Sequence, residues 1–203
     1  MDATVRMCKE KGVAVGAHPG YPDLMGFGRR AMAVNPGEAK AYMTYQLGAL
    51  QAFCDSYGVT LQHMKLHGAF YNTACVTPAL ADAVLDGLQA VNPNIAAMVL
   101  SGSYIAKEAQ RRGIPVIQEI FADRGYTDEG TLVPRTEPGA FIKDPQEALE
   151  RVLMMVKEGK VVTNTGNTID IVADSICVHG IIQKRSLSQS IFVKVFESGR
   201  NGS

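Results

Sequence analysis

Short apolar segments alternate with amphipathic segments along the chain, and this alternation limits the folds it can adopt. Five segments rich in apolar or β-branched residues are predicted strands, at residues 13–18, 61–67, 95–101, 115–123 and 169–179. Alternation at this spacing predicts an α/β fold whose parallel sheet is covered by helices and is either doubly wound or closed as a barrel. Several segments are apolar on both faces, as a sheet buried on both sides requires.

The clearest helix is predicted between the first two strands. Asn35 is placed as N-cap, Pro36 in the first turn, Glu38 as capping-box partner and Gly58 as the stop. Its predicted buried stripe is Met43, Leu47, Leu50 and Cys54. Similar signals predict helices that start near residues 77, 103 and 144, whereas residues 125–144, rich in Gly, Pro and charge, predict a long loop.

Composition excludes several classes of function. A length of 203 residues predicts one domain, and 46% apolar with 20% charged residues is ordinary for a globular protein. The apolar runs are too short to cross a bilayer, so no membrane partner is expected. With 20 basic and 20 acidic residues, nucleic-acid binding has no electrostatic support. Four scattered cysteines without a CxxC spacing and no signal peptide predict a reduced, cytoplasmic protein.

Polar residues recur where the predicted strands end. His18 ends the first, His67 the second, Asp123 with Arg124 the fourth, and His179 the fifth. In a parallel α/β fold these ends lie on one rim, where active sites of such folds occur. A single histidine at the end of a strand is more often structural, but His18, His67, Asp123 and His179 together predict a functional site.

The second predicted strand carries three titratable groups at alternate positions. His63, Lys65 and His67 share one face if residues 61–67 are extended. Because lysine is rarely buried without a partner, that face is expected to meet polar groups or a cavity. His63, deepest in the strand, is interpreted as structural.

The rim residues offer acid–base chemistry and anion recognition. Histidine titrates near neutral pH and serves as general base, Asp123 orients it or shares its proton, and Arg124 and Arg135 grip a carboxylate. An ordinary loop cation is an equal alternative for Arg135. The spacings match neither HExxH nor a CxxC pair, so the binding of a divalent metal is left open. The segment GFGRR (26–30) is neither GxGxxG nor Walker A, and it is interpreted as a turn with exposed arginines. These residues predict a hydrolase or lyase acting on a small anionic compound.

Five motifs in order resemble those of the LamB/YcsF family over about residues 1–180. They are GVAVGAHPGYPDLMGFGRR, YQLGAL, MKLHGAFYN, EIFADRGYTDEGTLVPR and ICVHG. The resemblance implies a distorted (β/α) barrel of the glycoside hydrolase/deacetylase type. It also implies the family's activity, which is the ATP-dependent opening of 5-oxo-L-proline to L-glutamate by 5-oxoprolinase. Subunits B and C of that enzyme are then partners of this chain, and ATP is a co-substrate. Which subunit binds ATP is left open.

The resemblance carries site residues over motif by motif. It implies roles near the lactam for His18, Asp23, Lys65, His67, Asp123, Arg124 and His179. We assign the catalytic work to His67, Asp123, His18 and Lys65, and substrate binding to Asp23, Arg124, Arg135 and His179. Because the lactam amide is resonance-stabilised, coupling to ATP is chemically sensible. The hypothetical mechanism phosphorylates the lactam oxygen and adds a water held by His67 or Asp123.

Both ends depart from the family pattern. The DLNxDxGE-like and GFHAGD motifs of the family are not present in this sequence. Residues 1–180 are therefore expected to form a partial barrel without its N-terminal strands. The open edges of such a barrel favour low activity, low solubility or strand exchange between copies. Residues 181–203 are interpreted as a divergent tail produced by a frameshift, because codons for GDNPEA can spell GIIQKR after loss of one nucleotide. A genuine divergent C-terminus is the alternative.

Three functions therefore stand side by side. The first is a component of 5-oxoprolinase. The second is a metal-dependent amidase or deacetylase of the same barrel class. The third is an inactive truncated remnant or binding scaffold, and a homo-oligomer is open for all three.

Overall fold

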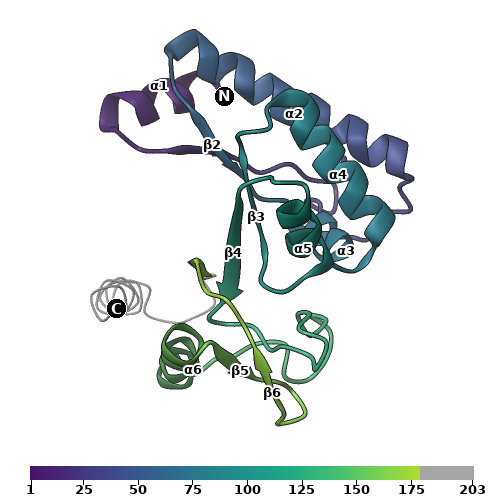
Figure 1. Cartoon of the computed structure of the whole chain (residues 1–203), viewed down its shortest axis with the longest axis vertical. Helices are drawn as coiled ribbons and strands as arrows, with labels where there is room; N and C mark the ends of the chain where they lie inside the picture. Colours follow the sequence, from purple (N-terminus) through teal and green to yellow (C-terminus); the bar gives the residue numbers. More distant parts are fainter. Residues whose placement is uncertain (179–203) are drawn as a thin grey trace. The chain divides into compact units, whose positions relative to one another are not determined.

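The computed structural model describes residues 1–178, which fall into two compact units (Figure 1). The first unit comprises residues 1–99 and 103–117, and the second comprises residues 100–102 together with the chain from 118 onward. The predicted tail at 181–203 and the predicted site residue His179 lie outside the described residues.

Five strands form the main sheet, and the pairs whose register is given are parallel. The strands are β1 (Val15–Ala17), β2 (Leu61–Met64), β3 (Ala96–Leu100), β4 (Val116–Phe121) and β7 (Ser175–Cys177), in the order β1-β2-β3-β4-β7. Parallel pairing joins β1 to β2, β2 to β3 and β4 to β7. The α/β class with a parallel sheet is therefore confirmed.

Five helices belong to the first unit. They are α1 (Asp2–Lys11), α2 (Pro36–Tyr57), α3 (Gly68–Val76), α4 (Pro78–Val91) and α5 (Tyr104–Arg111). Helices α2 and α4 run side by side (Figure 1). A Cβ at Gly87 would lie 2.7 Å from the Cβ of Met43 and 3.0 Å from the carbonyl oxygen of Lys40, so glycine is what lets α4 approach α2 this closely.

The capping prediction for α2 is confirmed. The Asn35 side chain accepts from the Glu38 backbone N–H while the Glu38 carboxylate accepts from the Asn35 N–H, and Gly58 ends the helix at φ 62°. The buried stripe is confirmed for three of its four members, because Met43, Leu47 and Cys54 are fully buried. Leu50 is a correction: it is only half-buried.

The second unit contains α6 (Pro145–Glu158) and a small antiparallel pair, β5 (Lys160–Val162) with β6 (Thr168–Asp170). The residues between β4 and α6 form the predicted long loop, with isolated bridges from Arg124 to Phe141 and from Tyr126 to Leu132. Asp128 of this loop accepts hydrogen bonds from Thr163, Thr165 and Asn167, which lie in the β5–β6 turn. The carboxylate thereby ties the loop to the hairpin.

Two predicted strands differ from the observed ones. The segment 61–67 is a strand only to Met64, although extended pairing continues because the Lys65 N–H donates to the Ala17 carbonyl. The segment 169–179 contains the end of β6 and the whole of β7, separated by a break at which the Asp174 carboxylate accepts from the Gln118 backbone N–H. Alternating apolar residues do not reveal such a break, because the side-chain pattern on either side is the same.

The cysteine and membrane predictions can be compared with residues 1–178. All four cysteines are free, and Cys54 and Cys75 are buried. Within this range no single helix is long and apolar enough to cross a membrane. Helices α3 and α4 taken together reach the length and apolar composition of a membrane span, but the chain bends by 116° between them.

Gly68→Ala is expected to lower the free energy of unfolding by about 2–4 kcal/mol. The loss has two causes: alanine is strained in a left-handed backbone, and its Cβ would overpack the site. Gly68 has φ 58°, and a Cβ there would lie 2.5 Å from the Gly28 carbonyl oxygen. Gly58→Ala is the matched control, because Gly58 has φ 62° and no atom within 4 Å of the added Cβ, so a loss of only about 1–2 kcal/mol is expected. Denaturant unfolding measures both, and equal losses would contradict the role of the Gly28 contact.

Candidate functional site

Two neighbouring strands bring His18 and His67 together. His18 follows β1 and His67 lies three residues after β2, and the backbone pairing of β1 with β2 extends beyond both strands because the His67 N–H donates to the Pro19 carbonyl at 2.7 Å. His67 is still extended, at φ −93° and ψ 138°, and is the N-cap of α3. The parallel register thus places both imidazoles at the same edge of the sheet.

The two imidazoles are in direct contact. His67 Nδ1 lies 3.0 Å from His18 Nε2, and the rings meet edge to face with centroids 4.9 Å apart. The outer nitrogens contact backbone carbonyls: His18 Nδ1 lies 2.7 Å from the Lys65 oxygen, and His67 Nε2 lies 2.7 Å from the Phe27 oxygen. All four ring nitrogens therefore have a partner within the first unit.

The Phe27 carbonyl is presented by a tight turn at residues 23–30. Phe27 has φ 53°, the one positive value at a non-glycine residue within residues 1–178, and Gly28 follows at φ 64°. The Asp23 carboxylate accepts from the Gly26 N–H and forms an ion pair with Arg30. A single carboxylate thus closes the turn from inside, and the left-handed backbone points the Phe27 oxygen at His67.

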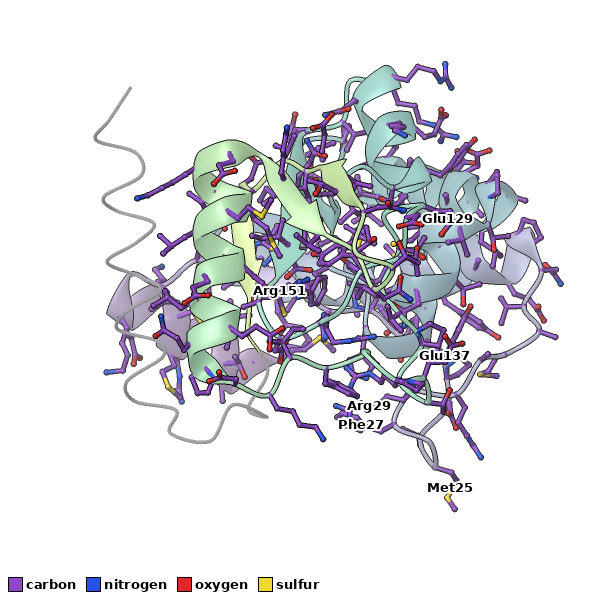
Figure 2. The ribbon with its side chains drawn as sticks, turned by 90° about the horizontal axis from the view of Figure 1, so that it is seen from below. Met25, Phe27, Arg29, Glu129, Glu137 and Arg151 are labelled. Carbon is purple, nitrogen blue, oxygen red and sulfur yellow. The ribbon has the colours of Figure 1, made fainter. Side chains whose placement is uncertain are left out.

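The same turn exposes a cluster of apolar and basic side chains. Figure 2 shows Met25 at the tip, with Phe27 and Arg29 close to each other. The Arg29 guanidinium carbon lies 5.5 Å from the centre of the Phe27 ring. Leu24 and Met25 are 96% and 93% exposed, so the tip has almost no packing of its own. The interpretation of GFGRR as a turn with exposed arginines is confirmed.

His63 and Lys65 differ in their surroundings. A Cβ on Gly16, the register partner of His63 in β1, would lie 2.2 Å from the His63 ring. The ring thus occupies the space of the missing side chain, which fits its structural interpretation. Lys65 is half-buried, and its carbonyl is the acceptor for His18.

Burial and nearby charges shift the pKa values of His18 and Asp23. Desolvation of the His18 ring lowers its pKa most, and the nearby charges of His67, Lys65 and His63 lower it further, against the hydrogen bond to the Lys65 carbonyl. Hydrogen bonds from Arg30 hold the pKa of Asp23 at about 2, well below its usual value of 3.8. Asp23 is therefore a fixed anion already neutralised by Arg30.

The remaining predicted residues lie in the second unit. Asp123 is fully buried, and its carbonyl accepts from the Ile142 N–H. The Arg124 guanidinium donates to the Ala140 and Val133 carbonyls at 2.9 and 2.5 Å, so it holds the long loop against β4.

Arg124 and Arg135 also share an aromatic neighbour. Both guanidinium carbons lie 5.2 Å from the centre of the Phe141 ring, and burial with the charge of Arg135 lowers the pKa of Arg124. The predicted substrate contacts of Arg124 and Arg135, and the predicted convergence of Asp123 with the histidines, stay predictions.

Sequence reasoning did not find three features of the site. It left out the backbone carbonyl of Phe27, the ion pair of Arg30 with Asp23, and the dependence of the turn on Gly28. The spacing of Asp23 and Arg30 around two glycines was a usable signal, because a closed turn of this length often needs a side chain to satisfy its backbone donors.

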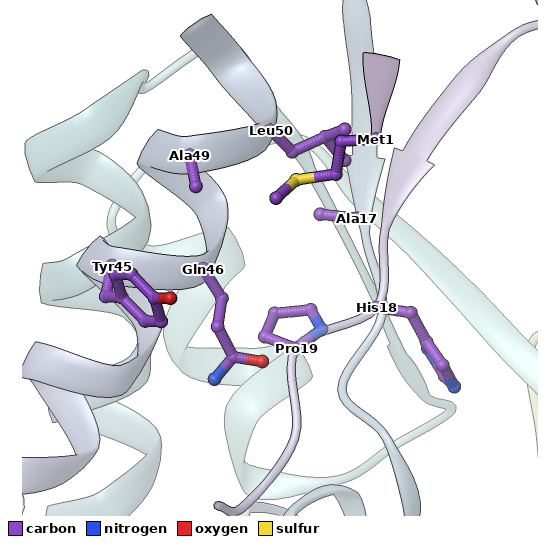
Figure 3. A pocket seen from close by; sticks show the side chains of 8 residues that line it. All are labelled: Met1, Ala17, His18, Pro19, Tyr45, Gln46, Ala49 and Leu50. Carbon is purple, nitrogen blue, oxygen red and sulfur yellow. The ribbon is translucent and has the colours of Figure 1, made fainter. Parts of the chain in front are cut away.

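A surface hollow of about 280 Å³ lies behind His18. Figure 3 shows its lining, and the His18 imidazole points away from Tyr45 and Gln46; the lining residues are Met1, Ala17, His18, Pro19, Tyr45, Gln46, Ala49 and Leu50. The Gln46 side chain is committed to Gly20, to whose carbonyl it donates and from whose N–H it accepts. Within residues 1–178, no group of three or more His, Cys, Asp or Glu side chains is placed to hold a metal ion.

The chain belongs to the LamB/YcsF family, whose description matches residues 1–192. It is 62% identical over 180 residues to the A subunit of 5-oxoprolinase from Fusobacterium nucleatum, an alignment that covers 89% of this chain and 70% of that protein. It is 52% identical, again over 180 residues, to the A subunit of 5-oxoprolinase from Clostridium beijerinckii, covering 89% of this chain and 71% of that one.

A solved structure is also similar. The lactam utilization protein from Thermus thermophilus matches with a TM-score of 0.80 and 42% identity, over 98% of this chain and 78% of that one. The resemblance drawn from the five motifs is therefore confirmed at the level of the family.

Arg30→Ala is expected to raise the pKa of Asp23 from about 2 towards the usual 3.8, because the largest cause of its depression is the hydrogen bond from Arg30. In the wild type, the stability from this carboxylate is present above pH 4 and is lost as the pH falls towards 2; in the variant that pH dependence shrinks.

Carboxyl carbon NMR titration of Asp23 measures the change. Arg29→Ala is the control, because the described hydrogen bonds of the Asp23 side chain come from Arg30 and Gly26. An unchanged pKa in Arg30→Ala would contradict the ion pair as the cause.

Proposed function

We propose that the chain acts as the A subunit of a 5-oxoprolinase, which opens the lactam ring of 5-oxo-L-proline to L-glutamate. The observation that carries the proposal is the 62% identity over 89% of the chain to a protein of that name, together with membership of the LamB/YcsF family. The similar solved structure, a lactam utilization protein, supports the same class of substrate.

The histidine pair supports acid–base work at this site. Ring opening breaks an amide bond, so the ring nitrogen must receive a proton while water adds to the carbonyl carbon. His18 and His67 are close enough to exchange a proton, and Lys65 adds a positive side chain from the same strand end. Asp123 and Arg124 are proposed to act on the same substrate.

Neither nitrogen of His67 is open to a water molecule in this arrangement. Nδ1 faces His18 and Nε2 faces the Phe27 carbonyl. To hold the attacking water, His67 would first have to release one of these partners. The pair is therefore better suited to supplying charge and a proton than to activating water directly, and the buried Asp123 is the alternative base.

ATP and partner subunits are part of the proposal. The word "subunit" in the relatives' names implies further subunits, which we propose to be subunits B and C. The sequence has no Walker A motif, so we propose that the ATP consumed by the reaction is bound by the assembled enzyme and leave its binding polypeptide unassigned. We also propose a cytoplasmic location, in keeping with four free cysteines.

The finer architecture is proposed to be a distorted (β/α) barrel of the glycoside hydrolase/deacetylase type. The parallel order β1-β2-β3-β4-β7, with helices between consecutive strands, supports it.

The proposed function is tested by co-expressing this chain with subunits B and C and measuring glutamate released from 5-oxoproline with ATP present. Release that depends on all three polypeptides is the expected result. Release that is unchanged when this chain is omitted would overturn the proposal. Turnover without ATP that depends on an added divalent metal would instead favour the amidase alternative.

His67→Ala is expected to lower kcat of the assembled enzyme roughly 10²- to 10⁴-fold, the range for loss of a positioned acid–base group. His63→Ala is the control, because His63 lies in the same strand region and packs over Gly16. Glutamate release under saturating 5-oxoproline measures both variants. Equal rates for His67→Ala and the wild type would remove His67 from the reaction.

A further inference from the structure

The nitrogens of the His18–His67 pair cannot all be satisfied by two neutral rings. A backbone carbonyl only accepts hydrogen bonds, so His18 Nδ1 must carry the hydrogen that it donates to Lys65, and His67 Nε2 must carry the hydrogen that it donates to Phe27. A neutral imidazole carries only one hydrogen on nitrogen. Two neutral rings would therefore leave bare lone pairs on both inner nitrogens.

Those inner nitrogens lie 3.0 Å apart, which is a hydrogen-bond distance. Two lone pairs at this distance repel each other. Moving a hydrogen inward on either ring does not help, because it leaves that ring's outer nitrogen facing a carbonyl oxygen at 2.7 Å without a proton. One additional proton on the inner contact satisfies all three short contacts at once.

We propose that His18 and His67 hold one extra proton between His18 Nε2 and His67 Nδ1, so that the pair is a single cation that titrates as one unit. The Phe27 carbonyl, set by the turn that Asp23 and Arg30 close, is the positioning group that fixes the tautomer of His67. The inference does not rest on the proposed function, because it concerns the protonation state of the folded chain.

The surrounding charges oppose a second proton more than the first. Lys65 and His63 approach from the β2 segment, and Arg29 and the neutralised Asp23–Arg30 pair lie in the turn. His67 also caps the N-terminal end of α3, where the helix dipole disfavours a cation. The charges of Lys65 and His63 disfavour a dication, whereas a monocation retains its internal hydrogen bond.

The pair should therefore titrate in two well-separated steps, as strongly interacting sites do. The shared proton is the last to leave as the pH rises, because its loss removes the inner hydrogen bond. The second proton binds at a lower pH than the shared one, because it turns the pair into a dication.

Nitrogen-15 NMR of the full 203-residue chain, with labelled histidine, tests the proposal. Between the two steps we expect hydrogens on His18 Nδ1 and His67 Nε2, and a proton shared by the two inner nitrogens. Two independent single-site titrations, or a direct change from two neutral rings to a dication, would overturn it.

Two variants remove the inner contact while keeping the outer ones. His18→Asn retains a donor near the Nδ1 position for the Lys65 carbonyl, and His67→Gln retains one near the Nε2 position for the Phe27 carbonyl. In each variant the remaining histidine is expected to bind its proton at least roughly tenfold more weakly than the wild-type pair binds its shared proton.

His63→Gln is the matched control, because it removes a nearby imidazole without touching the 3.0 Å contact. It should leave the high-pH step in place. Equal proton affinity in the wild type and in both inner-contact variants would overturn the shared proton, and the wild-type spectrum decides the matter even where a variant does not fold.

Discussion

The close backbone approach between Gly28 and Gly68 is the constraint on which the site of the first unit depends. The Ala69 N–H donates to the Gly28 carbonyl at 2.9 Å, and a side chain at Gly68 would collide with that same carbonyl. Because both glycines have positive φ, the turn after β1 can lie directly against the start of α3. That contact brings the Phe27 carbonyl to His67 and so decides which nitrogen of this ring carries hydrogen.

The charged groups of the two units are used in different ways. Asp23 is paired with Arg30, and Arg124 donates to two loop carbonyls, so both serve the local structure first. The His18–His67 contact is different, because its partners require a charge that the surroundings partly oppose. A hydrogen bond to a charged group contributes about 1.5–3 kcal/mol, at the lower end for a ring as exposed as His18, whereas a helix dipole at a surface site costs about 0.3–1 kcal/mol. The hydrogen bond therefore outweighs the dipole.

The sequence predicted the parts of the fold that local chemistry decides. Asn35 with Glu38 marked the start of α2 correctly, because a capping box is a short-range arrangement of side chains and backbone. The break between β6 and β7 was missed, because it depends on a bond from Gln118 to Asp174 across 56 residues. Helix α3 was also missed, since its segment continues an apolar run without a capping side chain.

The site could be predicted only in part for the same reason. Strand-end positions pointed to His18 and His67, and parallel pairing of β1 with β2 brings these two together. The Phe27 carbonyl could not be found from residue types, because every residue has a carbonyl and only the positive φ aims this one. The tautomers follow from that backbone geometry and from nothing in the side-chain pattern.

The exposed tip of the turn lies next in the chain to the carbonyl that contacts His67. Leu24 and Met25 are almost fully exposed. Two residues after Met25, the Phe27 carbonyl oxygen lies 2.7 Å from His67 Nε2. Because the positive φ of Phe27 aims its carbonyl at His67, a substitution that changes this backbone conformation removes the contact that selects the tautomer of the ring.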